Sequence, residues 1–600
     1  MTASEPPSPM NARVPHDPNQ ERKEVASTSS NVLKEKTKDE PITAQNTSHT
    51  PEKHEWITGV KLAIIITAIT LVTLLMLLDT SIVVTVSMPA FGLDIYGSLM
   101  TTQAIPRITS EFHSLPDIGW YGSAYQLARY VSPFRPMVAI ETNNSAVHRS
   151  SHLPEDSTSI LIPRRWTFMG FFAIFELGSL ICAVATSSKM FIVGRAIAGI
   201  GTSGIINGAF TIIAGCVPME RRPSMLGIVM GISQLGLAAG PLIGGALTEY
   251  ATWRWCFWIN LPVGGLVAIM LCFLHVPEQI TKPKFFTAIK SLPGKLDLVG
   301  FALFAPSAIQ LLLALEYGGN QYAWHSSQVI GLFCGAGATF IVFLVWDYYQ
   351  GDAAIIPFSI VRKRIVWSSC LTYGLLMGQM FCASYYLPIY FQGVRGATPT
   401  LSGVYILPSV LGQLFAALIS GKLVERVGYY LPIIAGSAAL MSVSNGLLST
   451  LAPHTSTGKW IGYQILLGVA RGLGLQMPIV AVQNAMPPPQ IPIATALVVF
   501  SQTFAGALFL SLSDTIFTNS LKTLLPEYAP SVKPETVIDA GATGLRSQVS
   551  AAELANVVIA YAKSVDRVFY LTAGMATGCF FFSLAMGWKD IRKKAPVSQA

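Results

Sequence analysis

Apolar runs of about twenty residues recur along this chain, and each is long enough to cross the hydrocarbon core of a bilayer. Lipid offers the backbone no hydrogen-bond partner, so each crossing segment must be a helix. The sequence therefore predicts an all-α membrane protein. The fourteen predicted spans are Ile57–Thr85, a second that begins near Ile118, Trp166–Ala185, Phe191–Val217, Met225–Leu247, Trp255–Leu274, Leu298–Leu315, Gln328–Trp346, Val366–Phe391, Leu401–Val424, Leu431–Thr450, Trp460–Gln483, Ile491–Phe517 and Val568–Trp588.

The charge content agrees with a membrane protein. Only 12% of the residues are charged, about half the fraction usual in soluble domains, and the mean hydropathy is +0.49. A net charge of +8 could suggest a nucleic-acid partner. The Lys and Arg residues lie instead in short loops between apolar runs, which is how membrane topology is encoded, so no nucleic-acid partner is expected.

The spans divide the chain into segments. Residues 1–55 are polar and predicted to be a disordered cytoplasmic tail. The first six spans fall within 56–280, two further helices within 295–350, and the last six spans within 362–590; 591–600 form a second cytoplasmic tail. The polar stretch 518–566, before the last span, is predicted to be a long outside loop.

The fifth predicted span carries a glycine pattern. It reads GLAAGPLIGG from Gly236 to Gly245, with Gly240, Pro241 and Gly244 between. Glycines four residues apart share one helix face and let a neighbouring backbone approach closely. Proline lacks the N–H that would continue the helical ladder, so Pro241 allows a bend.

Further segments complete a family pattern. Leu77–Thr85 reads LLDTSIVVT, Gly194–Gly204 reads GRAIAGIGTSG, and Trp253–Gly265 reads WRWCFWINLPVGG. With the GxxxGPxxGG spacing, they resemble the major facilitator superfamily, specifically its fourteen-helix drug:proton antiporter branch. The resemblance covers roughly Ile57 to Trp588 and is strongest to fungal toxin and multidrug exporters.

The resemblance implies a major facilitator fold of two six-helix halves plus two inserted helices. It implies a monomer that exchanges protons for a hydrophobic or amphipathic small molecule, such as a fungal toxin, secondary metabolite or drug, in the plasma membrane or, alternatively, the vacuolar membrane. No cofactor or metal is expected, and no enzyme motif or ATP-binding G-x-x-x-x-G-K-[ST] sequence is present. The alternatives are a siderophore or amino-acid porter, or a non-transporting or inactive membrane protein.

Two stretches depart from the family pattern and motivate the last alternative. Residues 86–103 interrupt the signature of the first span, and residues from about 129 to 164 replace the end of the second span and its basic loop. Both open on Val-Ser, which the 5′ consensus of an intron encodes, so we interpret the first as a retained intron and the second as intron retention or a frame error. The corresponding loop of the second half, GKLVERVGYY, is intact.

That intact sequence is expected to form a gating loop. Its residues are Gly421, Lys422, Glu425, Arg426 and Gly428. Glu425 stands where the family usually has Asp.

Charged residues within predicted spans are functional candidates, because a charge in lipid is costly. Asp79 and Arg195 lie toward the outside face and could form a charge pair that biases a gate, or a static surface ion pair. Glu176 lies in the middle of the third span and is the preferred proton carrier, the alternative being a structural hydrogen bond to a neighbouring helix. Arg471 is interpreted as the second-half echo of Arg195.

Candidate substrate contacts lie on the ninth and thirteenth spans. Gln379 and Gln502 are amides within apolar segments, and Tyr373 and Met377 lie near Gln379. Polarisable Met and aromatic side chains suit a cavity that accepts varied shapes. The alternative is that Tyr373 and Met377 serve only in packing.

The basic residues predict the topology. A cytoplasmic N-terminus places twenty Lys and Arg residues in inside loops and the C-terminal tail, and only five in short outside loops. We therefore expect an epitope tag at Lys34 to be protected in intact cells and a tag near Pro534 to be accessible to antibody. Tags that are accessible from the same side would contradict this topology.

Overall fold

The computed structural model describes residues 56–84, 108, 111–112, 124–125, 128, 164–273, 297–318, 322–351, 354–487 and 490–592. These residues belong to one compact unit, Glu55–Ala600. Within the described residues the chain is helical, and the β structure is limited to two isolated bridges. The predicted all-α fold class is confirmed.

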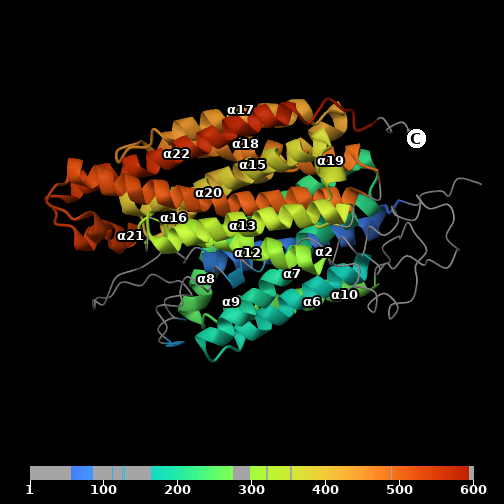
Figure 1. Ribbon diagram of the computed structural model, residues 1–600, viewed down its shortest axis with the longest axis horizontal. Coiled ribbons are helices and arrows are strands. Elements are labelled where there is room, and N and C mark those ends of the chain that lie inside the picture. Colours follow the sequence, from blue (N-terminus) through green and yellow to red (C-terminus); the bar gives the residue numbers. More distant parts are fainter. Residues whose placement is uncertain are drawn as a thin grey trace, which may run out of the picture. The chain divides into compact units, whose positions relative to one another are not determined.

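The described helices of the first half follow the predicted spans closely. Helix α2 packs lengthwise on α8, and α6 packs on α7 (Figure 1). The predicted sixth span is two helices, separated at Ile259. The bounds are α2 Gly59–Val84, α6 Arg164–Ala183, α7 Ser188–Cys216, α8 Arg222–Tyr250, α9 Trp255–Trp258 and α10 Asn260–Phe273.

The second half repeats this kind of packing. Helix α16 packs on α18, α15 on α20 and α22, and α17 on α18 and α22 (Figure 1). The two extra helices, α12 Leu298–Tyr317 and α13 Ser327–Gln350, pack on each other, and α12 also contacts α20. The remaining bounds are α14 Phe358–Val361, α15 Arg364–Ile389, a π-helical turn η5 Tyr390–Val394, α16 Pro399–Val427, α17 Leu431–Leu448, α18 Thr457–Gly474, α19 Met477–Ala485, α20 Ile491–Tyr528, α21 Pro534–Gln548 and α22 Leu554–Leu584.

Many of these helices can cross a membrane. Among the described residues, eleven are long and apolar enough, and the shorter Val299–Leu315 is also apolar. Helix α13 keeps Ile341, Val342 and Val345 more than half exposed, which suits contact with lipid. The second predicted span lies outside the described residues except for Ala124, Tyr125 and Ala128, as do stretches 86–103 and 129–163, so the count of fourteen stays a prediction.

The stretch predicted as a long polar loop, 518–566, is largely helical. Helix α20 continues to Tyr528, α21 covers Pro534–Gln548, and α22 begins at Leu554 rather than near Val568. Its polar composition conceals apolar side chains at helical spacing. Leu521, Leu525, Val537, Leu545 and Val557 are all buried, so the segment forms amphipathic helices that pack together.

The motif around Trp253 fixes one end of the first half. The indole N–H of Trp253 donates to Glu111 at 2.7 Å, and Arg254 forms an ion pair with Glu111 at 2.8 Å and donates to the Ala185 carbonyl. Trp253 also meets the Phe191 ring edge to face, with centroids 5.7 Å apart. The Trp253 hydrogen bond, followed by Arg254, holds the pKa of Glu111 below its usual range.

Glycine lets α2 and α8 pack backbone to backbone. A Cβ added at Gly236 would lie 2.5 Å from the Leu74 carbonyl oxygen, where no side chain fits. Two hydroxyl contacts hold the same seam: Thr73 and Ser233 oxygens lie 2.5 Å apart, and Ser81 donates to the Gly236 carbonyl at 3.1 Å. The predicted role of Gly236 in close helix packing therefore has a direct structural basis.

We predict that Gly236→Val destabilises the protein by about 1–3 kcal/mol, because the new side chain must push α2 away from α8. The matched control is Gly446→Val on α17, where an added Cβ has open space. The measurement is the fraction of detergent-solubilised protein that stays monodisperse after heating. Equal loss in the two variants would show that the seam tolerates a side chain.

Candidate transport site

Helices α8 and α16 bring the two halves into direct backbone contact. A Cβ added at Gly227 would lie 2.6 Å from the Ala417 carbonyl oxygen, and one added at Gly421 would lie 2.6 Å from that of Pro223. The amide of Gln476 donates to the Ala417 carbonyl at 3.2 Å. Small residues at such crossings allow the closest approach that helices can make.

A polar bridge adjoins this contact. Ser224, in the first turn of α8, donates to the Glu425 carboxylate at 2.5 Å. The positive end of the α8 dipole favours an anion there. Glu425 belongs to the segment predicted as a gating loop, and the structure brings it from the second half onto the start of a first-half helix.

The other gating-loop residues lie at the end of α16. Lys422 and Arg426 are exposed. Gly428 ends the helix with φ +83°, a backbone conformation that suits glycine, and its carbonyl accepts from Ile591 N–H at 2.9 Å. This loop is thus tied to the residues that follow α22.

A cavity lies further along the same helices. Its polar lining is Gln234 of α8, Ser384 of α15, Ser409 and Gln413 of α16 and Arg471 of α18. The apolar lining is Met380, Ala383, Leu387, Ile406, Val410 and Leu467. The cavity therefore has both polar and apolar walls, and one wall comes from the first half.

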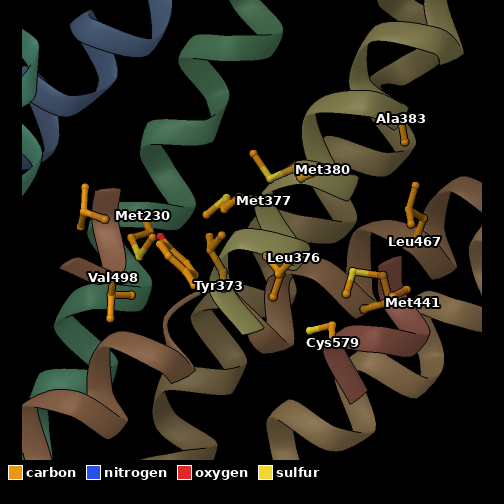
Figure 2. Packing of buried hydrophobic residues seen from close by; sticks show 14 of the residues in the cluster. Met230, Tyr373, Leu376, Met377, Met380, Ala383, Met441, Leu467, Val498 and Cys579 are labelled. Atoms are coloured by element: carbon orange, nitrogen blue, oxygen red, sulfur yellow. The ribbon is translucent and has the colours of Figure 1, made fainter. Parts of the chain in front are cut away.

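None of the substrate residues predicted on α15 and α20 is among the residues that line this cavity. Tyr373 and Met377 are buried in an apolar cluster with Met230 of α8 and Val498 of α20 (Figure 2). Gln502 on α20 is 9% exposed and is not a lining residue either.

Gln379 reaches the cavity indirectly. Its side-chain oxygen accepts from Arg471 at 3.2 Å, and its amide nitrogen donates to Asn445 at 3.0 Å. Gln234 and Gln413 line the cavity but were not predicted as substrate contacts. Both are amides within apolar helices, the signal that singled out Gln379, and that signal was available for them too.

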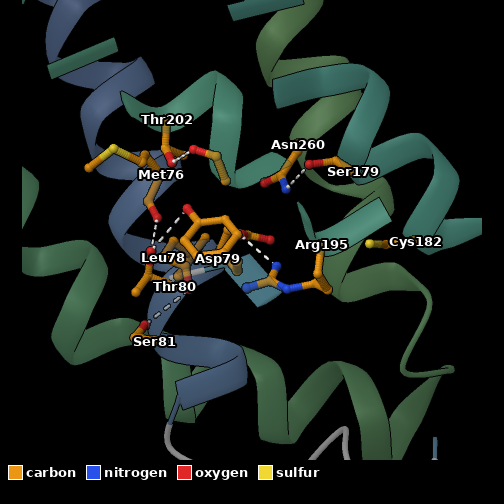
Figure 3. Close-up of polar contacts among 12 residues, drawn as sticks. Met76, Leu78, Asp79, Thr80, Ser81, Ser179, Cys182, Arg195, Thr202 and Asn260 are labelled. Carbon is orange, nitrogen blue, oxygen red and sulfur yellow. Dashed lines mark hydrogen bonds and ion pairs between the residues drawn. The ribbon is translucent and has the colours of Figure 1, made fainter. Parts of the chain in front are cut away.

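Asp79 and Arg195 form a buried ion pair. Arg195 Nη1 donates to Asp79 Oδ2 at 2.8 Å, and both side chains are 1% exposed. The guanidinium lies 4.1 Å from the Tyr125 ring centroid, and the Tyr125 hydroxyl accepts from Thr80 at 3.1 Å (Figure 3). The alternative of a surface ion pair is wrong, because neighbouring helices and the Tyr125 ring cover both groups.

Glu176 is a second acidic group within the first half. It lies on α6, and both carboxylate oxygens are buried and make no hydrogen bond to any described residue. A Cβ added at Gly264 of α10 would overlap the Glu176 carboxylate, so glycine makes room for it. The neighbouring polar pair, Asn260 and Ser179, is hydrogen-bonded at 3.1 Å (Figure 3). The alternative role for Glu176 was a structural hydrogen bond to a neighbouring helix. Within the described part of the chain, Glu176 makes no such bond.

The remaining glycine-motif residues lie in the C-terminal half of α8. Gly240 and Gly244 are buried, and the Gly244 carbonyl faces the Cys256 thiol, with sulfur 3.9 Å from oxygen. Pro241 and Gly245 lie within the same helix. The motif thus extends from the contact of α8 with α2 to the part of α8 that contacts α9.

The fold and these features define a polytopic membrane transporter. The family model of the Major Facilitator Superfamily matches residues 157–510. This chain belongs to the Major Facilitator Superfamily and groups with its fungal efflux-type transporters, not with enzymes.

Two fungal relatives and one solved structure illustrate the similarity. The MFS-type transporter pigP of Monascus ruber is 57% identical, over 90% of this chain and 88% of that protein. The efflux pump mlcE of Penicillium citrinum is 46% identical, over 91% and 93%. The crystal structure of the human organic anion transporter MFSD10 (TETRAN), 12% identical with a TM-score of 0.52, covers 88% of this chain and 100% of that one and supports the fold.

We predict that Asp79→Asn destabilises the protein by about 3–5 kcal/mol, because it removes the anion from a buried guanidinium. The control is Glu111→Gln, which breaks a partly exposed pair and should cost about 0–1 kcal/mol. Thermal unfolding midpoints of the purified variants measure the difference. Equal shifts would contradict the importance of burial at Asp79.

Proposed function

We propose that this chain is a proton-driven exporter that acts as a monomer in the plasma membrane. It exchanges protons for a hydrophobic or amphipathic small molecule, such as a fungal toxin, secondary metabolite or drug. The names of relatives, such as the efflux pumps mlcE and mokI, support the outward direction. The sequence carries no phosphate-binding loop of the ATPase type, so an ion gradient supplies the energy.

The single observation that carries proton coupling is the site of Glu176. Its two carboxylate oxygens are buried without a hydrogen-bond partner in the described residues. An ionised carboxylate is costly in such a place unless water or a cation reaches it. In our proposal Glu176 carries the proton and loses it when the site opens to water, and the Asp79–Arg195 pair biases the gate.

The contact between α8 and α16 serves as the inner gate in this proposal. The predicted topology places the Ser224–Glu425 bridge at the cytoplasmic end, where the exporter must take up its substrate. This bridge and the glycine contact beside it have to separate before a molecule can enter from the cytoplasm. In this proposal Gly236 provides the close packing of α8, and Gly240 and Pro241 allow the helix to bend during such movement.

We predict that Glu176→Gln abolishes uphill efflux, because glutamine cannot bind and release a proton. Downhill exchange and substrate binding should remain within about twofold of wild type, since the amide has the same shape. The measurement is efflux of the neutral amphipathic dye Nile red from yeast cells that express each variant, with and without an outward concentration gradient.

Glu111→Gln is the matched control and should pump normally, because Glu111 lies outside the candidate spans found among the described residues. A protonophore should stop wild-type efflux at constant ATP. Normal uphill pumping by Glu176→Gln would assign proton carriage to another residue, with Asp79 the next to test. Efflux that survives the protonophore would reject proton coupling itself.

A further inference from the structure

The second half contains an arginine in a position that corresponds to Arg195 but with a different partner. In the first half, Asp79 of α2 pairs with Arg195 of α7. In the second half, the corresponding helices are α15 and α18, and they carry Gln379 and Arg471 in direct contact at 3.2 Å. A neutral amide therefore stands where the first half has a carboxylate.

Within the described residues, the hydrogen bonds of the Arg471 guanidinium are all with neutral groups. Besides the Gln379 side chain, its Nη2 atom donates to the Gln379 and Met380 carbonyl oxygens, both at 3.4 Å. In the described part of the chain, no carboxylate forms an ion pair with Arg471, and Nη1 donates to no described group. The residue is only 2% exposed. A buried cation without an anion is strongly unfavourable within a membrane.

Arg471 borders the cavity that helices α8, α15, α16 and α18 line. Arg471 is a lining residue, and it lies near the middle of the span Thr457–Ala485. The amide groups of Gln234 and Gln413 and the hydroxyl groups of Ser384 and Ser409 line the same space. Met380 and Ile406 are among the apolar side chains that line this space, and the Gln413 amide lies 3.7 Å from the Met380 sulfur. The site thus offers one cation, neutral hydrogen-bonding groups and an apolar surface.

We propose that Arg471 binds the acidic group of the transported molecule, so that the preferred substrates are amphipathic organic acids. The substrate carboxylate takes the place that Asp79 occupies beside Arg195, and its apolar part lies along Met380 and Ile406. Gln379 orients the guanidinium without neutralising it. This inference rests on the proposed export function and adds the chemical class of the substrate.

The test compares an acid with its own ester. Pyrenebutyric acid and its methyl ester differ in charge but share the same apolar ring system. Binding of each to the purified full-length protein in lipid nanodiscs is measured by fluorescence, with empty nanodiscs as the background. Wild type should bind the acid about tenfold or more tightly than the ester, as expected for a charge-assisted hydrogen bond out of water.

Two substitutions remove the unpaired charge in different ways. Arg471→Gln removes the cation, and Gln379→Asp supplies the missing carboxylate, as in the first half. Both should abolish the preference for the acid by weakening binding of the acid far more than binding of the ester, whereas Arg471→Lys should keep part of the preference. Unfolding midpoints identify any variant that has lost its fold, and the Gln379→Asp variant is expected to be at least as stable as wild type.

The outcomes separate this inference from the proposed function. Binding is measured without any gradient, so loss of proton coupling would not alter the preference for the acid. Wild-type protein that binds the acid no better than the ester, or Arg471→Gln protein that keeps the preference, would overturn the inference. An arginine that serves only to join α15 and α18 would change stability but not the ratio of acid to ester affinity.

Discussion

The absence of hydrogen-bond partners in lipid governs this structure. A polar group within the spans is costly unless it finds a partner inside the helix bundle. Hydroxyls therefore bond back to their own helix, as Thr80 does to the Met76 carbonyl at 2.8 Å. Glycines bring backbones together where helices cross, and the charge of Arg195 is met by Asp79 at 2.8 Å. The helices, their seams and the buried charges all follow from this one constraint.

Most of the helices could be predicted from the sequence, because length and hydropathy decide whether a segment crosses a membrane. The helices within 518–566 could not be predicted in this way, because the mean composition of an amphipathic helix is polar. Such a helix is recognised only from the spacing of its apolar residues, here Leu521 and Leu525. The face of α15 that lines the cavity could not be predicted either. Apolar residues occur on all sides of this helix. The sequence therefore could not predict that Met380, and not Met377, lines the cavity. The charged candidates were easier to identify from the sequence, because a charge within a membrane span is costly and is therefore a functional candidate.

The two halves differ in the groups they bury. The first half holds Asp79, which is paired with Arg195, and Glu176, which has no hydrogen-bond partner in the described residues. The second half supplies most of the cavity and holds Arg471 among neutral groups. In our proposal this asymmetry divides the work: the first half carries protons, and the second half binds the substrate. Helices α8 and α16 join the halves, so movement at this contact would couple the two events.

The most direct test is whether the α8–α16 contact must open during transport. Ser224→Cys combined with Glu425→Cys can be joined by a short, cleavable bifunctional thiol reagent, because the native side chains touch at 2.5 Å. Wild-type protein treated with the same reagent controls for reaction at the exposed Cys272 and Cys334. We expect the joined protein to lose efflux and to recover it when the link is cleaved. Normal efflux by the joined protein would contradict a gate at this contact.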